Sequence, residues 1–279
     1  MRERLGARVG RKRRIVMVTF ERKRLAALML LTAAGTFCLA GMTHAAEDGK
    51  RSPWAVFKFG FSAYKKGDKN EAVKAYRYAA EQGHAGANWK LGRMYADGDG
   101  VNRDDYQAYR FFEQVVRKGA EQGSPDETYF ADSLVALAGY LKTGIPNTPV
   151  KADPGLAQDL YLQAATIYGD ARAQFEIGRM MLDSAGRKSV NNVRQAARWL
   201  GLATEKGHAG AQALLGNLLF QSGKSVRGLA MMTAALERSQ PADRPWILKL
   251  QEEAFAVSPE ADRRTAIALS EDILRSGDR

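Results

Sequence analysis

The segment Glu81-Gln-Gly-His-Ala-Gly-Ala-Asn-Trp-Lys-Leu-Gly92 returns 124 residues later as Glu205-Lys-Gly-His-Ala-Gly-Ala-Gln-Ala-Leu-Leu-Gly216, with eight of twelve positions identical. Self-similarity of this kind is typical of repeat proteins, in which each unit buries its apolar face against its neighbours. The sequence therefore predicts a stacked solenoid. Its function is expected on an extended surface, which favours binding over catalysis.

A second pattern marks the other half of each unit. A small residue is followed by bulky or apolar residues at +3 or +4, by small or apolar residues at +7 and +8, and usually by Gly at +11. This is the spacing of an amphipathic helix, and the closing Gly fits a left-handed C-cap. The copies begin at Ala72, Ala108, Ala157, Ala196 and Gly228. Their separations of 36, 49, 39 and 32 residues indicate a unit of about 36 residues, with an insertion in the third.

The first helix of a unit carries a small residue four positions before a Leu or Ile that is followed by Gly. The copies are Ala87-Leu91-Gly92, Ala173-Ile177-Gly178 and Ala211-Leu215-Gly216. Small side chains at these positions would let two helices approach closely. The sequence thus predicts consecutive helix pairs, an all-α architecture.

From Ala87 to Ala108 the chain reads Ala-xxx-Leu-Gly-xx-Tyr-xx-Gly-x-Gly-Val-xx-Asp-xxx-Ala, which resembles the Sel1-like repeat, a relative of the tetratricopeptide repeat. The resemblance covers residues 53–240 and implies an α/α superhelical solenoid of about five helix pairs. Units one, three and five lack the Gly-x-Gly-Val loop. Without this loop motif, the sequence does not predict the loop geometry of these units, but it still predicts that their helices pair.

The segments Lys50 to Tyr64 and Arg227 to Arg238, with the N-terminal apolar run and the total length, resemble more narrowly a group of exported regulators. This resemblance implies a periplasmic negative regulator of exopolysaccharide production. Such a protein binds the sensing domain of a membrane histidine kinase and keeps its two-component system off. The alternative is a structural scaffold of a cell-envelope or polysaccharide-export complex, because the same repeats and secretion fit it equally well.

Most of the formal charge of +11 lies in residues 1–46, where ten Lys/Arg stand against two Glu and leave only +3 for the other 233 residues. A charged start, an apolar run from Leu25 to Met42 and the ending Thr43-His-Ala-Ala46 have the order of a secretory signal peptide. We expect cleavage near Ala45 or Ala46 and release into the periplasm. A single membrane anchor is the alternative. Translation from Met17 instead of Met1 would give a more ordinary charged region.

No pattern in the sequence points to catalysis, a cofactor or a metal. Cys38 lies in the apolar run, so the processed chain would hold no thiol for a disulfide, a metal or a nucleophile. His84 and His208 follow the terminal Gly of equivalent helices and are interpreted as turn residues. The loop from Asp97 to Asp104 lacks the Glu that a calcium loop needs at its twelfth position. We therefore expect a binding protein and not an enzyme.

The chain is expected to divide into a signal peptide (1–46), a repeat solenoid (47–240) and C-terminal capping helices (241–279). Within the solenoid, the proline-rich segment 143–154 is expected to project as a loop that is accessible to proteases, because each proline disfavours helix in the residue before it. Two further helices, over 245–257 and 259–275, would cover the open end of the stack.

An aromatic residue four positions before an arginine recurs on the first helices, as Trp89 with Arg93 and Phe175 with Arg179. At 100° per residue these side chains lie opposite the buried stripe that contains Leu91. In tetratricopeptide-type stacks that face lines the concave groove, and aromatic residues with arginine are typical of interface hot spots. The predicted partner-binding residues are Phe57, Phe61, Trp89, Arg93, Phe175 and Arg179. The alternative is that they pack against adjacent units.

Overall fold

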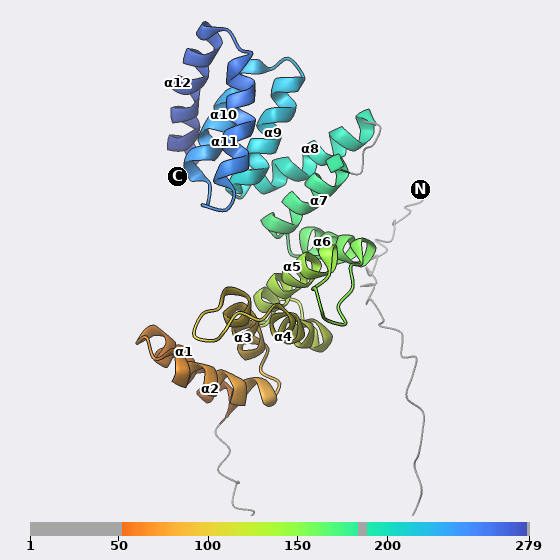
Figure 1. Cartoon of the computed structure of the whole chain (residues 1–279), viewed down its shortest axis with the longest axis vertical. Helices are drawn as coiled ribbons and strands as arrows, with labels where there is room; N and C mark the ends of the chain where they lie inside the picture. Colours follow the sequence, from red (N-terminus) through yellow and green to blue (C-terminus); the bar gives the residue numbers. More distant parts are fainter. Residues whose placement is uncertain (1–51, 184–188, 278–279) are drawn as a thin grey trace, which may run out of the picture. The chain divides into compact units, whose positions relative to one another are not determined.

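The computed structural model describes residues 52–183 and 189–277, and this part of the chain consists of twelve α-helices without a β-strand (Figure 1). The helices are α1 (Pro53–Lys65), α2 (Lys69–Glu81), α3 (Ala85–Asp97), α4 (Asp105–Lys118), α5 (Glu127–Thr143), α6 (Pro154–Ile167), α7 (Ala171–Asp183), α8 (Val190–Glu205), α9 (Ala209–Gln221), α10 (Ser225–Arg238), α11 (Arg244–Ala256) and α12 (Glu260–Gly277). The all-α prediction is confirmed. The predicted signal peptide lies outside the described residues, and none of the described helices is long and apolar enough to cross a bilayer.

Helices α1 to α10 form five successive pairs. Each odd-numbered helix, here called a first helix, packs on the even-numbered second helix that follows it, and each second helix then packs on the next first helix. Each unit therefore buries its apolar residues between its own helices and against the adjacent unit, as expected for a solenoid.

A glycine marks the point where a first helix crosses its second helix. A Cβ atom built on Gly92 would lie 2.8 Å from the ring of Phe112 in α4, and one on Gly178 would lie 2.9 Å from Leu200 in α8. Gly60 in α1 and Gly216 in α9 hold the same position against α2 and α10. The prediction that small residues allow close approach of two helices is confirmed at these crossings.

Local signals explain where the second helices begin and end. The side chains of Asp68, Asp104 and Asp153 accept hydrogen bonds from the first-turn N–H groups of α2, α4 and α6, which is the usual role of an N-cap. Gly83 and Gly207 follow α2 and α8 with φ angles of 78° and 80°, in the left-handed region that glycine tolerates. The predicted C-terminal glycines are therefore confirmed at these two positions.

The proline-rich insertion is a non-helical and largely exposed loop, as predicted, but Ile145 and Val150 attach it to the core. Ile145 and Val150 are both buried, and the N–H of Ile145 donates to the carbonyl of Val150 at 3.0 Å. The N–H of Asp153 donates to the carbonyl of Leu141 at 2.7 Å. The prolines prevent helix as expected, while the two buried apolar side chains hold the loop against the core on either side of its exposed tip near Asn147.

Helices α11 and α12 replace a further repeat at the C-terminal end. They begin and end within two residues of the predicted ranges, and both pack on α10. Leu229 and Met232 of α10 form an apolar cluster with Ala254 of α11 and Ala266 of α12. We propose that these two helices cap the stack, because they bury apolar surface that a sixth pair would otherwise cover.

Candidate protein-binding surface

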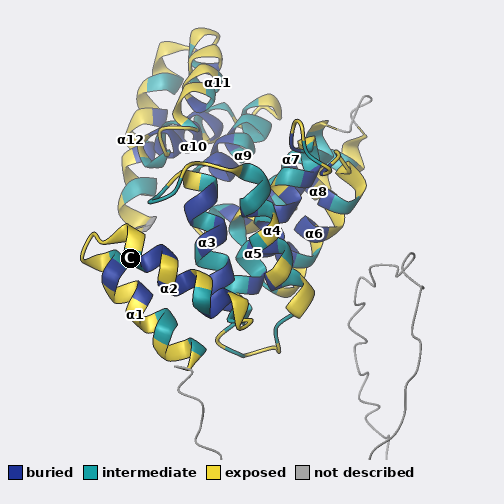
Figure 2. Ribbon diagram, turned by 60° about the horizontal axis from the view of Figure 1, so that its bottom comes forward, coloured by how far each residue is buried: buried dark blue, intermediate teal, exposed yellow. Residues whose placement is uncertain are grey.

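The predicted binding residues lie on the first helices, but they differ in how far solvent reaches them. Phe175 is only 7% exposed, and Phe57 and Trp89 are partly buried, whereas Phe61 is 47% exposed. Arg93 and Arg179 are partly exposed. Figure 2 shows the change along the stack, from an α1 with many exposed residues to an α3 that is mostly buried. Burial therefore favours packing against adjacent units, the alternative left open by the sequence, for Phe57, Trp89 and Phe175.

Trp89 and Arg93 converge on one carboxylate of the next unit, Asp132 of α5. The indole Nε1–H of Trp89 donates to Oδ2 of Asp132 at 2.5 Å, and the guanidinium of Arg93 lies 3.9 Å from the same oxygen. Arg172 of α7 donates to the other oxygen, Oδ1. Asp132 thus connects three consecutive first helices, although its side chain is only 16% exposed.

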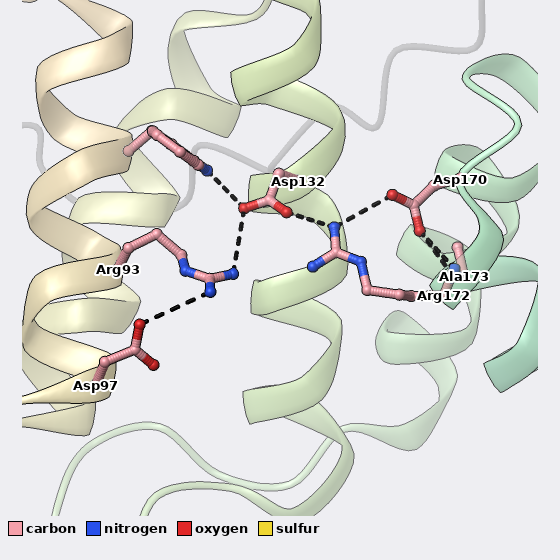
Figure 3. Close-up of polar contacts among 7 residues, drawn as sticks. Arg93, Asp97, Asp132, Asp170, Arg172 and Ala173 are labelled. Carbon is pink, nitrogen blue, oxygen red and sulfur yellow. Dashed lines mark hydrogen bonds and ion pairs between the residues drawn. The ribbon is translucent and has the colours of Figure 1, made fainter. Parts of the chain in front are cut away.

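The cations around Asp132 are shared with two further carboxylates. Arg172 also pairs with Asp170 at 3.2 Å, and Arg93 pairs with Asp97 at 3.7 Å (Figure 3). Trp89, Arg93, Asp132, Asp170 and Arg172 are called the Asp132 cluster below. It is a chain of alternating charges along the first helices, in which Asp132 is sheltered from solvent and both arginines stay partly exposed.

Phe175 and Phe57 occupy the same structural position in different units. The ring of Phe175 stacks on His208 with centroids 4.5 Å apart, and the ring of Phe57 stacks on His84 at the same 4.5 Å. Each histidine belongs to the start of the next first helix in the described stack. These aromatic residues therefore form the contact between two units, which explains their burial.

His84 and His208 lie in turns, as predicted, and they also cap helices. Nδ1 of His84 accepts the N–H of Ala87 at 3.2 Å, and Nδ1 of His208 accepts the N–H of Ala211 at 3.2 Å. Burial lowers the pKa of both imidazoles, because the charged form loses hydration. Only the neutral ring with an unprotonated Nδ1 can make this cap.

Arg179 takes part in a smaller network at the next unit. Its guanidinium donates to Glu176 at 2.7 Å and lies 5.5 Å from the ring centroid of Phe175. Lys142 of α5 reaches the same Glu176 at 3.1 Å. Arg179 thus stacks on a buried aromatic residue while part of its side chain faces solvent.

The acidic loop after α3 is occupied by cations of the protein itself. Asp99 forms an ion pair with Lys69 at 2.5 Å and accepts a hydrogen bond from the hydroxyl of Tyr64. These hydrogen bonds from Lys69 and Tyr64 lower the pKa of the Asp99 carboxyl. Lys90 adds its ammonium 3.7 Å from the ring of Tyr64. The described residues hold no group of three or more His, Cys, Asp or Glu side chains placed to bind a metal.

Comparison with known proteins places the repeats in a family. The family model of the Sel1 repeat matches residues 57–84, 85–124, 131–166 and 171–208. A crystal structure of a Sel1 repeat protein from Oxalobacter formigenes superimposes with a TM-score of 0.54 at 22% identity, over 82% of this chain and 91% of that one. The second match supports the fold alone.

Two curated relatives are similar over nearly their whole length. The exopolysaccharide production negative regulator of Rhizobium meliloti (strain 1021) is 49% identical over 90% of this chain and 94% of its own. The protein of the same name from Rhizobium leguminosarum bv. viciae is 46% identical over 90% of this chain and 95% of its own.

Proposed function

The chain belongs to the Sel1 repeat family and to the same family as the two rhizobial regulators, and from this premise we propose that it is a negative regulator of exopolysaccharide production. The observation that carries the proposal is the 49% identity to the Rhizobium meliloti regulator, which extends over 94% of that protein. The match covers the repeats and the C-terminal region together, so it concerns the whole protein and not a widespread module.

The proposed mechanism is binding rather than catalysis. The protein would bind the sensing domain of a membrane histidine kinase and hold its two-component system off. Solenoids of helix pairs present long surfaces suited to another polypeptide. Of the predicted residues, Phe61, Arg93 and Arg179 keep a substantial part of their side chains accessible and are the candidates for direct contact. Trp89 and Phe175, which are more buried, would hold these accessible side chains in position.

The proposed location is the periplasm. A basic start followed by an apolar run supports export by a cleaved signal peptide. The near-balanced charge of the remaining residues fits a role that does not involve nucleic acid. Fractionation of cells, with N-terminal sequencing of the protein found outside the cytoplasm, tests this part. A mature form that begins near residue 46 is expected, and a full-length chain confined to the cytoplasm would contradict it.

Deletion of the gene in its own bacterium tests the function. A repressor predicts excess exopolysaccharide and constitutive expression of genes under the two-component system, both restored by the intact gene. Loss of polysaccharide export would instead favour the scaffold of an envelope complex. Unchanged polysaccharide, together with substrate turnover by the purified protein, would favour an enzyme and end the proposal.

A further inference from the structure

The first helix of the stack exposes a face that later first helices bury. Alignment of the repeats on the crossing glycines places Ala55 and Phe59 of α1 at the positions of Ala87 and Leu91 in α3. Ala87 and Leu91 have no exposed surface, and Ala173 and Ile177 of α7 are buried in the same way. In α1, by contrast, Ala55 is exposed and Phe59 is 49% exposed.

A helix covers this face in the later pairs. The second helix of the preceding pair packs on each later first helix, α2 on α3 and α6 on α7. In α3, Asn88 donates to the carbonyl of Ala80 and Tyr95 accepts from Arg77, both of α2, so α2 lies on the side of Ala87 and Leu91. Within the described residues, α1 has no preceding second helix. A small residue followed one turn later by an apolar residue lets a second helix pack closely on the first. The face at Ala55 and Phe59 therefore has the pattern that receives an α-helix elsewhere in this chain.

Phe59 is among the most exposed large apolar residues of the described chain. Exposed apolar surface of this kind commonly marks an interaction site in a soluble protein. Trp54 and Phe61, which are also exposed, lie on the other side of α1, at the positions of Gly86 and Arg93 in α3. At the C-terminal end of the stack, α11 and α12 pack on α10 and cover it. In the described residues, no helix covers α1 in this way at the N-terminal end.

The charge around the face indicates what would cover it. Residues 52–67 contain three lysines and no acidic residue. Lys58 follows Ala55 by three positions and Lys66 follows Phe59 by seven, so both lysines lie beside this face of the helix. A second copy docked through its own α1 would bring like charges together, and residues 1–46 of the same chain carry a net charge of +8.

We infer that the face formed by Ala55 and Phe59, with Lys58 and Lys66 beside it, binds an amphipathic α-helix with acidic flanks from another protein. That helix would dock on α1 as α2 docks on α3 and would extend the stack by one helix at its N-terminal end. The identity of the partner rests on the proposed function, under which the helix belongs to the sensing domain of the kinase.

Photo-crosslinking in the native bacterium tests the docking itself. The full chain would carry p-benzoylphenylalanine in place of Phe59, and a control chain would carry it in place of Ile267 of α12, which is similarly exposed at 47%. The expected result is an adduct at position 59 that maps by mass spectrometry to a helical segment of another protein with more acidic than basic residues. No adduct, or adducts only with lipid, with residues 1–51 or with a second copy, would overturn the inference.

Affinity measurements then connect the face to the proposed function. With the purified periplasmic sensing domain as the probe, Ala55→Arg and Phe59→Asp should each weaken binding by about 10-fold or more, because both block apolar helix docking. The matched exposed residues of α12, in Ala268→Arg and Ile267→Asp, should leave it unchanged. Circular dichroism melting of all four variants shows whether folding is retained.

The outcomes distinguish the inferred helix-binding face from the proposed kinase partner. If the sensing domain binds and the α1 variants bind as tightly as the wild type, the inference is wrong and the proposed function stands. If the wild type does not bind the sensing domain, the proposed partner is wrong. The crosslink at position 59 then decides whether the face takes an acidic helix from a different protein or none at all.

Discussion

The indole of Trp89 in α3 and the carboxylate of Asp132 in α5 share a hydrogen bond of 2.5 Å across the boundary between two helix pairs. Because Arg172 of α7 binds the other oxygen of the same carboxylate, one side chain connects three consecutive units of the stack. The stack is thus held by directional bonds on its first-helix side as well as by apolar packing between the helices.

Asp132→Ala should lower the free energy of unfolding by about 2 kcal/mol, because Trp89 and Arg172 lose a hydrogen-bond acceptor and Arg93 loses an ion-pair partner. Asp159→Ala, at an exposed position of α6, serves as the control and should change stability by less than about 0.5 kcal/mol. Urea unfolding followed by circular dichroism measures both. An Asp132→Ala chain as stable as the control would show that the cluster contributes specificity of geometry and not stability.

Trp89→Ala should also destabilise the fold, by about 2 kcal/mol, since it removes a partly buried ring that contacts Tyr129 as well as Asp132. Arg93→Ala should cost less than about 1 kcal/mol, because its ion pairs are solvent-accessible. The two substitutions are best made separately: Arg93→Ala tests partner binding in a folded chain, and Trp89→Ala tests support of the interface. Equal melting temperatures for the two variants would contradict the assignment of Trp89 to stability and of Arg93 to partner binding.

Stability should fall as the pH drops below about 6.5, the ordinary pKa of histidine. His84 and His208 have lowered pKa values in the folded state, so the unfolded chain binds protons first and is favoured by acid. Each imidazole contributes at most about 1.4 kcal/mol per pH unit. Urea unfolding at several pH values between 8 and 5 measures the slope.

A double variant, His84→Asp with His208→Asp, provides the control for this pH dependence. Asp170 already caps α7 in the same way, accepting the N–H of Ala173 at 2.9 Å, and a carboxylate stays ionised through that pH range. The variant should therefore lose most of the dependence between pH 7 and 5. An unchanged slope would assign the acid sensitivity to other groups.

Gly92→Ala should destabilise the chain by about 1–3 kcal/mol, because the new methyl group would meet the ring of Phe112 at 2.8 Å in a tightly packed crossing. Gly201→Ala in α8 should do the opposite and stabilise by up to about 1 kcal/mol, since nothing lies near its Cβ position and alanine favours helix. Thermal melting of both variants checks the pair. Stabilisation by both would mean that the crossing tolerates wider spacing.

The helix pairs were predictable because their signals are local. The crossing glycines and the helix-ending glycines appear in the sequence at helical spacing, and the structure places them at crossings and helix ends. The Asp132 cluster was not predictable in the same way. Its members lie 40 and 43 residues from Asp132, and only the stacking of units brings them together.

Two other features were missed for physical reasons. The Gly-His pair before α3 and α9 was recognised as a turn, but histidine is not among the preferred N-cap residues, so its capping role needed the geometry of Nδ1. In the insertion, the prolines predict an exposed loop, but no periodic pattern indicates that Ile145 and Val150 are buried. Burial of these two apolar side chains holds the loop against the core.

The packing of each helix chiefly on helices one or two places away in the chain has a kinetic consequence. Contacts that are close in sequence require little loop closure, so such topologies form quickly and without waiting for distant segments. Each pair is stabilised by the pair before it, so two neighbouring pairs can pack together once both have left the ribosome. The stack can therefore assemble during synthesis, from its N-terminal end.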